Sequence, residues 1–426
     1  MLYQSMPVND IKKELESLYK KLDTLKNKKL NLDMSRGKPA RAQLELSDGM
    51  LSCLSADECV LSPAIDLRNY GVVDGIPACK KLFADLLDVE CDEIMVCGNS
   101  SLNIMYDTIV RAMLFGVNEE STPWKDQGEI KFLCPAPGYD RHFRICETMG
   151  IKMITIPMTA TGPDMDEVER LVSSDESIKG IWCVPKYSNP EGITYSDETV
   201  RRFASLNPKA SDFRIFWDNA YFIHEIYEDK ADTLLNLLTE LKKTGKEDMA
   251  YIFASTSKIT YPGAGVGVIA SSKKNIDFAI KHMFVQTIGH DKINQGRHVK
   301  FFDNAQNVRA HMMKHAAIMR PKFDVVLSAL EREFENGDIA SWTKPLGGYF
   351  ISLDLLDGCA KKTVEMCAET GVKLTDAGAT YPYGIDPRDR NIRIAPSYPT
   401  IDELKEAAEV LCVCAKITCL ERMLNK

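Results

Sequence analysis

The sequence of 426 residues lacks several features that mark whole classes of protein. It has no basic run, and its net charge of −8 argues against nucleic acid as a partner. No apolar run approaches the length that a membrane-spanning helix needs, and the first thirty residues lack the pattern of a signal peptide. No GxGxxG follows an early strand pattern, which disfavours a Rossmann oxidoreductase, and no helix-turn-helix pattern indicates a transcription regulator.

The 13 cysteines form no recognisable metal or disulfide pattern. There is no CxxC pair and no His/Cys cluster at zinc spacing, so we predict no metal site. Many cysteines lie in apolar runs, as Cys97, Cys134 and Cys183 do, which favours reduced core residues. The sequence therefore predicts a cytoplasmic protein without contact to a membrane.

The middle of the chain alternates short apolar runs with helical patterns. Hydrophobic residues make up 45% of the chain and charged residues 27%, which is ordinary for a soluble globular protein. This alternation predicts an α/β fold with a mostly parallel, seven-stranded sheet and helices on both faces. The expected strands are Ile94–Cys97, Lys131–Cys134, Lys152–Ile156, Gly180–Val184, Phe213–Trp217, Tyr251–Ala254 and Val266–Ala270.

The two ends of the chain have a different pattern. Leucines and Ile11 at spacings of three and four predict an amphipathic helix over 8–28. Near the other end we expect a long helix over 304–334, a strand over 347–353 and a closing helix over 401–424. The expected division is an N-terminal helix and arm, 1–45, that joins a smaller α+β domain, 306–426, and a large ligand-binding domain, 46–305.

Residues suited to an anion follow the first expected strand. Gly98-Asn99-Ser100-Ser101 stands immediately before an apolar-periodic helix. Backbone N–H groups and hydroxyls at a helix N-terminus can bind a phosphate. Ordinary capping by Asn99 or Ser100 explains the same residues equally well.

Two later turns carry residues that can face the same crevice, because ligands of such sheets bind beyond the carboxyl ends of the strands. Tyr139 follows a turn of prolines and glycine, where it can pack internally or stack on a flat ring. Asn189 precedes Pro190, where it can shape the turn or donate to a ligand oxygen. The Asn189–Pro190 bond can also be cis.

The strongest chemical signals are three charged residues near strand ends or on a strand. Asp218 ends a buried strand, where a carboxylate is costly unless it is paired with, for example, a cationic ring nitrogen. Lys258 follows hydroxyl residues and can form a Schiff base with an aldehyde. Arg393 lies within an apolar strand and needs either a bound carboxylate or an internal salt bridge.

One ligand accounts for all of these residues together: pyridoxal 5′-phosphate bound with an amino-acid substrate. The predicted roles around the phosphate belong to Gly98, Asn99, Ser100, Ser101 and Ser255, and Ser257 is a further predicted cofactor contact. Tyr139 is expected to stack on the ring, Asp218 to pair with the ring nitrogen, and Tyr221 and Asn189 to contact the ring oxygen, with Asn189 also expected to contact the substrate. Lys258 is expected to form the Schiff base and Arg393 to bind the α-carboxylate.

With these motifs the chain resembles a fold-type I, class I aminotransferase, from about Arg36 to Pro396. The motifs that carry the resemblance are Asn69-Tyr70-Gly71, Gly75-Ile76-Pro77, Pro137-Gly138-Tyr139, Asn189-Pro190-Glu191-Gly192, Asp218-Asn219-Ala220-Tyr221, Ser255-Thr256-Ser257-Lys258 and Asn391-Ile392-Arg393. The resemblance implies a homodimer with shared active sites, in which Tyr70 reaches the phosphate of the neighbouring subunit's cofactor. It also implies transamination, with Lys258 moving the substrate's α-proton.

The chain departs from this family in the turn after the lysine. Gly265 stands where the family has an arginine that binds the phosphate. This Gly-Ala-Gly turn, with Arg36-Gly37-Lys38-Pro39 and the segment 139–143, resembles a divergent bacterial branch of aspartate aminotransferases. The resemblance suggests aspartate as the amino donor and 2-oxoglutarate as the acceptor.

A dicarboxylate substrate needs a second cation besides Arg393. Arg36, beside Gly37, and Arg141 are our predictions within the chain, with Lys292 and Arg297 as residues that a partner subunit can contribute. Surface solvation or an internal pair is the alternative for each. The sequence leaves rival activities open: an aromatic, alanine or kynurenine-type aminotransferase, a decarboxylase, a β-lyase, or a cofactor-binding protein without turnover.

Overall fold

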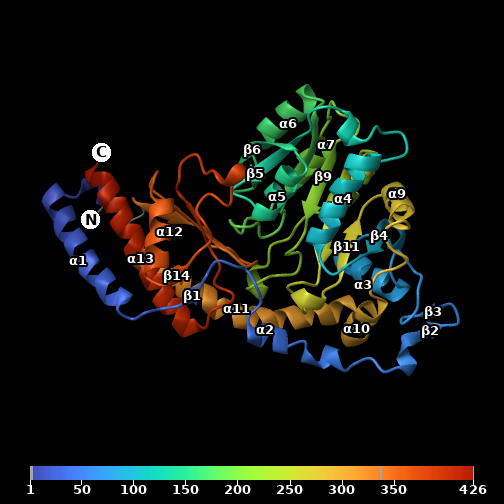
Figure 1. The fold of residues 1–426 in the computed structure, drawn as a ribbon, viewed down its shortest axis with the longest axis horizontal. Coiled ribbons are helices and arrows are strands. Elements are labelled where there is room, and N and C mark those ends of the chain that lie inside the picture. The colour runs from blue at the N-terminus through green and yellow to red at the C-terminus, as the bar shows by residue number, and fades with distance from the viewer. Residues whose placement is uncertain (1–2, 336–337, 426) are drawn as a thin grey trace.

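The computed structural model describes residues 3–335 and 338–425 (Figure 1). A large sheet with helices on both faces forms one part of the molecule. The N-terminal and C-terminal helices lie side by side in the other part, and a long helix, α11 (Ala305–Phe334), runs beneath both (Figure 1). No helix in the described ranges has both the length and the apolar character needed to cross a membrane.

The large sheet has the strand order β4-β11-β10-β9-β8-β5-β6-β7. Only β11 and the two-residue β7 run against the direction of the other strands. The strands are β4 (Ile94–Val96), β5 (Lys131–Ala136), β6 (Lys152–Thr159), β7 (Gly162–Pro163), β8 (Ile178–Cys183), β9 (Arg214–Asp218), β10 (Ala250–Ser255) and β11 (Gly267–Ala270). The seven predicted strands are confirmed, and β7 is an addition that two residues are too short to signal.

Helices enclose this sheet and bury its apolar side chains on both faces. The α-helices of the first 302 residues are α1 (Val8–Lys26), α2 (Arg41–Glu45), α3 (Pro77–Leu87), α4 (Ser101–Phe115), α5 (Asp140–Thr148), α6 (Met165–Ser174), α7 (Asp197–Ser205), α8 (Leu237–Lys243), α9 (Lys273–Met283) and α10 (Lys292–Phe302). Because both faces are covered, the central strands β8, β9 and β10 are buried throughout.

A second core lies between the two ends of the chain. Its elements are α1, α11, α12 (Ala360–Glu369), α13 (Ile401–Leu424) and a three-stranded antiparallel sheet of β12 (Ala340–Trp342), β13 (Ile351–Leu355) and β15 (Asn391–Ile394). Two shorter pairs complete the strands: β1 (Leu32–Asp33) with β14 (Val372–Lys373), and β2 (Val60–Ser62) with β3 (Ile65–Asp66). Helix α13 is apolar on nearly all sides because α1, α11 and α12 surround it.

The predicted helices at the two ends are confirmed, and one predicted strand needs correction. The strand expected over 347–353 begins only at Ile351. Gly348 has a φ of 79°, a left-handed conformation that a strand cannot contain, so the two glycines form a turn instead. The division of the chain at residues 45 and 305 stays a prediction; α11 itself contributes to both cores, through Met312 and Phe323.

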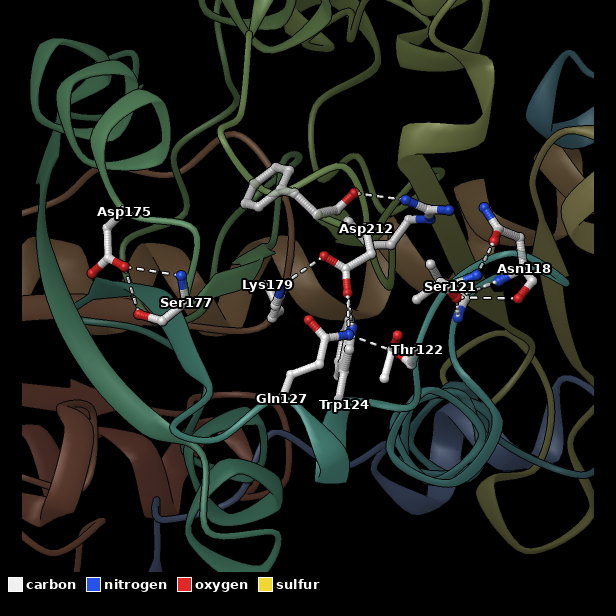
Figure 2. A network of polar contacts seen from close by, with 12 residues as sticks. Asn118, Ser121, Thr122, Trp124, Gln127, Asp175, Ser177, Lys179 and Asp212 are labelled. Atoms are coloured by element: carbon white, nitrogen blue, oxygen red, sulfur yellow. Dashed lines mark hydrogen bonds and ion pairs between the residues drawn. The ribbon is translucent and has the colours of Figure 1, made fainter.

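A closed polar network lies at the amino-terminal ends of the parallel strands (Figure 2). Asp212, just before β9, pairs through Oδ1 with Lys179 Nζ at 2.7 Å. Its Oδ2 accepts hydrogen bonds from Trp124 Nε1 at 3.0 Å and Gln127 Nε2 at 2.8 Å. Both carboxylate oxygens of this buried residue therefore have partners.

Candidate active site

The opposite ends of these strands form a cavity of about 520 Å³. This location agrees with the rule that ligands bind beyond the carboxyl ends of the strands in an open α/β sheet. The predicted site residues that line the cavity are Arg36, Gly37, Ser101, Tyr139, Arg141, Asn189, Asp218, Tyr221, Lys258 and Arg393. The structure thus brings together residues from five strand ends and from β15.

Lys258 lies just beyond β10 with its amine open to this cavity. Its Nζ lies 4.8 Å from the centre of the Tyr221 ring and has no hydrogen-bond or ion-pair partner among the described residues. Burial lowers the pKa of the Lys258 amine, and the nearby carboxylate of Asp218 partly opposes that shift. Burial also raises the pKa of the Tyr221 hydroxyl well above its usual value, which keeps it a hydrogen-bond donor.

Asp218, the last residue of β9, is only half satisfied. Its Oδ2 lies 3.0 Å from Nε2 of His142, whereas its Oδ1 is buried without a partner among the described residues. His142 in turn stacks on Trp182, with the ring centres 4.3 Å apart and the planes within 8°. One oxygen is therefore held in place while the other remains available to a ligand.

His142 is a site residue to which the sequence analysis assigned no role. It stands on the buried face of α5, three residues after Tyr139, with Phe143, Ile145 and Cys146. This helical spacing was the available signal. The partner, Asp218, is 76 residues away and could not be identified from the spacing.

Arg393 forms an internal salt bridge, which is the second of the two interpretations that its sequence allowed. Its Nη1 donates to Asp140 Oδ1 at 3.0 Å and to Asn189 Oδ1 at 3.2 Å, and its Nε donates to Thr375 Oγ1 at 3.3 Å. Its Nη2 has no partner among the described residues. The guanidinium group also lies over the ring of Phe350, with 4.9 Å between Cζ and the ring centre.

The predicted phosphate site lies at the N-terminus of α4. Ser100 caps this helix, because its Oγ accepts from the backbone N–H of Asn103 at 3.4 Å. The capping interpretation therefore holds for Ser100, while Ser101 and the following residue face the cavity. Gly98, Asn99 and Ser100 form the turn behind them, and Ser255 and Ser257 share a hydrogen bond beside Lys258, with 3.0 Å between the two Oγ atoms.

The glycine turn after Lys258 packs directly on this helix N-terminus. A Cβ atom at Gly265 would lie 2.7 Å from the carbonyl oxygen of Asn99, and one at Gly267 would lie 2.9 Å from that of Ser100. Asn294 of α10 holds the turn, because its Nδ2 donates to the carbonyl oxygens of Ala264 at 2.9 Å and Gly265 at 2.8 Å. A side chain at position 265 would therefore require the backbone at Asn99 to shift.

Two further predicted cations also line the cavity. Arg36 and Arg141 are exposed, and neither side chain has a hydrogen-bond or ion-pair partner among residues 3–335 and 338–425. Lys292 and Arg297 lie on α10 and do not line this chain's cavity. Tyr70 is 81% exposed and also lies outside the cavity.

The unsatisfied groups in the cavity match the polar atoms of pyridoxal phosphate. Asp218 Oδ1 is an acceptor for a protonated ring nitrogen, and Lys258 Nζ is an amine for the aldehyde. Asn189 Nδ2 has no partner within the described residues, and Asn189 lines the same cavity as the lysine. The residues present therefore fit this cofactor.

The comparisons with known proteins agree with this fit. The family model described as aspartate amino-transferase matches residues 3–426. An aspartate aminotransferase of Corynebacterium glutamicum is 40% identical, over 96% of this chain and 94% of its own length.

Solved structures have the same fold. An aspartate transaminase from C. glutamicum superposes with a TM-score of 0.96 at 39% identity, covering 99% of both chains. A Pyrococcus horikoshii kynurenine aminotransferase, solved in complex with PMP, has a TM-score of 0.74 at 21% identity and covers 95% of this chain and 94% of its own, which is a likeness of fold alone. The chain belongs to the aspartate aminotransferase family, whose members depend on pyridoxal 5′-phosphate.

Proposed function

We propose that this protein transfers the amino group of L-aspartate to 2-oxoglutarate. The observation that carries the proposal is that the free Lys258 amine and the unpaired Asp218 oxygen share one cavity with an excess of positive charge. The lining includes seven basic residues, Arg36, Lys38, Arg141, Arg144, Lys258, Lys373 and Arg393, and four acidic residues, Asp140, Glu147, Asp218 and Asp376. Such an excess suits a ligand that brings a phosphate and a dicarboxylate.

Each side chain around the lysine has a task in this reaction. Pyridoxal phosphate, when bound, supplies an aldehyde that takes up the amino group and a ring that withdraws electrons from the substrate. Lys258 Nζ accepts the substrate's α-proton, and its lowered pKa increases the neutral fraction that can do so. Asp218 Oδ1 accepts a hydrogen bond from the ring nitrogen, while Tyr221 and Asn189 donate to the ring oxygen.

The two carboxylates of aspartate have separate binding groups in the proposal. Arg393 binds the α-carboxylate, and Arg36 or Arg141 binds the distal one, because a free guanidinium group can bind a carboxylate through two hydrogen bonds. Gly37 lets the arm that carries Arg36 approach the site, since a Cβ atom there would lie 2.4 Å from the Phe350 ring.

The proposed enzyme is a homodimer whose subunits complete each other's sites. Tyr70 is 81% exposed, and the consecutive residues Phe284 and Val285, which directly follow α9, are 64% and 87% exposed. An interface with a second subunit would bury these side chains. In such a dimer Tyr70 contacts the partner's cofactor phosphate, and Lys292 and Arg297 are available to the partner's substrate. The cytoplasmic location stays a prediction.

Absorbance spectroscopy tests the reaction class and the donor together. Addition of aspartate to the cofactor-loaded protein should replace the band of the aldehyde form with that of the amine form and release one oxaloacetate per site. Addition of 2-oxoglutarate should then restore the first band. Ammonia and pyruvate as products would instead mean elimination, and an unchanged spectrum would contradict the proposal.

Separate replacement of Arg36 and Arg141 by alanine tests the distal carboxylate site. In at least one variant kcat/KM should fall about tenfold or more for aspartate relative to alanine, because alanine lacks the distal carboxylate. Equal losses for both amino acids in both variants would show that neither guanidinium group binds that carboxylate.

A further inference from the structure

The salt bridge between Asp140 and Arg393 joins two residues that are 253 positions apart. Asp140 begins α5 beside the large sheet, and Arg393 lies on β15 of the small one. Arg393 is only 8% exposed as a side chain, whereas the Asp140 side chain is 30% exposed and lines the cavity. The arginine is therefore fixed, and the aspartate has room to turn away.

Asp140 occupies a donor that a substrate needs. A carboxylate binds an arginine most firmly through two parallel hydrogen bonds from a pair of guanidinium nitrogens. Of the two terminal nitrogens of Arg393, Nη2 is free and Nη1 already donates to Asp140 and Asn189. A substrate carboxylate can bind both only if Asp140 or Asn189 leaves Nη1. Asp140 is the more exposed of these two partners, and it is the one that repels a second carboxylate.

The helix dipole alone does not explain why Asp140 lies at the start of α5 and contacts Arg393. A carboxylate in the first helical turn is favoured by the helix dipole. That effect requires no contact with an arginine on another sheet. It also gives the displaced carboxylate a stable place, because Asp140 can turn toward the cavity and remain in the first turn.

We propose that Asp140 sets the affinity of Arg393 for carboxylates: it is the resident counter-ion of Arg393, which the α-carboxylate of the substrate must displace. The inference rests on the proposed function for the identity of that substrate. Asp140 keeps the buried guanidinium group paired between turnovers. It weakens the binding of every carboxylate at Arg393, and a ligand without a carboxylate leaves the salt bridge closed.

Succinate is a suitable probe because it has two carboxylates and no amino group to react. Its dissociation constant would be measured by calorimetry with the cofactor-loaded wild type, Asp140→Asn, Asp140→Glu and Asp376→Asn. Asp376 is the matched control, since it lines the same cavity, is exposed, and makes no ion pair among the described residues. Asp140→Asn keeps the shape of the side chain and removes its charge.

We expect Asp140→Asn to bind succinate about tenfold more tightly than the wild type, because one charge-assisted hydrogen bond no longer competes. Asp376→Asn should change the affinity by less than about twofold, and Asp140→Glu should stay within about threefold of the wild type, if competition by a carboxylate is the cause. KM for aspartate should fall in Asp140→Asn with little change in kcat. A structural role alone would lower kcat as well.

Unchanged or weaker binding of succinate by Asp140→Asn would overturn the inference, and weaker binding would mean that Asp140 supports Arg393. A failure of the proposed function has a different signature. Succinate would still bind more tightly to Asp140→Asn, while aspartate would cause no turnover in the wild type.

Discussion

A buried aspartate lies near each end of strand β9, and the two differ in how many of their carboxylate oxygens have hydrogen-bond partners. Asp212, before the strand, has three partners for its two oxygens, and Lys179 is its ion pair (Figure 2). Asp218, at the other end, has His142 on one oxygen and nothing in the described chain on the other. The nearby Lys258 amine is likewise unpaired.

This difference separates a carboxylate that stabilises the fold from one that is prepared for a ligand. Leaving a buried acceptor without a partner costs about 1–3 kcal/mol, more when it is charged. The fold removes that cost at Asp212 and accepts it at Asp218. The same strand therefore has a structural end and a functional end.

The largest expected effect is on the two lysines. Lys258→Ala should reduce kcat by about 10⁴-fold or more, because it removes the proposed Schiff-base amine and proton acceptor, and should leave the thermal midpoint unchanged or slightly higher. Lys179→Ala should instead destabilise the fold by about 3–5 kcal/mol, because it leaves Asp212 buried and unpaired. Activity assays and thermal melts of both variants check this pair. Turnover by Lys258→Ala would place the chemistry on another residue.

A smaller effect, on cofactor affinity, is expected in the glycine turn after Lys258. Gly265→Ala should raise the dissociation constant of pyridoxal phosphate by about tenfold or more, because the new Cβ pushes against the carbonyl oxygen of Asn99 at the predicted phosphate site. Fluorescence titration of the apoprotein measures this constant. Gly263→Ala is the matched control, since nothing lies within 4 Å of a Cβ there. Equal affinities of the two variants for pyridoxal phosphate would show that this turn does not contribute to binding the phosphate.

Glu191, two residues after Asn189, is a third carboxylate to compare, and it is partly buried. Its Oε2 has no partner in the described ranges, and burial, with a contribution from Asp354, raises its pKa to about 8. The folded protein then holds a proton that the unfolded chain releases above its ordinary pKa. The stability should therefore decline as the pH rises from about 5 to 8.

Glu191→Gln should remove most of this decline and gain about 2 kcal/mol over the wild type at pH 8, with little difference at pH 5. Denaturant unfolding at both pH values measures it. If the free energy of unfolding changed equally with pH in the wild type and in Glu191→Gln, the Glu191 carboxylate would be ionised and solvated. This effect is smaller than those at the lysines and in the glycine turn, because a bound proton neutralises the Glu191 carboxylate.

The strands, the end helices and the site location could be predicted because they depend on local spacing. Apolar runs predicted the strands, and the rule on strand ends located Asn189, Asp218 and Lys258 at one edge. Contacts between distant parts of the chain could not be predicted in this way. His142 on Asp218, Asp140 on Arg393 and Asn294 on the glycine turn each depend on how separate elements pack.

Local spacing also failed to predict the exact bounds of one strand and the partner of Arg393. Gly348 has a left-handed φ and packs so closely that a Cβ atom there would lie 2.9 Å from Cβ of Tyr187, a contact between distant residues that the sequence did not reveal. Arg393 had two reasonable interpretations from its sequence, a ligand clamp and a salt bridge. The structure contains the salt bridge, and the clamp requires its displacement.

The most direct test of the comparison is the free energy of unfolding of two matched variants, Asp212→Asn and Asp218→Asn, both without cofactor. Asp212→Asn should lose about 3–5 kcal/mol, because Lys179 is left without its counter-ion. Asp218→Asn should differ from the wild type by less than about 1 kcal/mol, because one oxygen of the charged group has no partner and the amide oxygen of Asn can still accept a hydrogen bond from His142. Equal losses in the two variants would contradict the account, since Asp218 would then be a structural residue like Asp212.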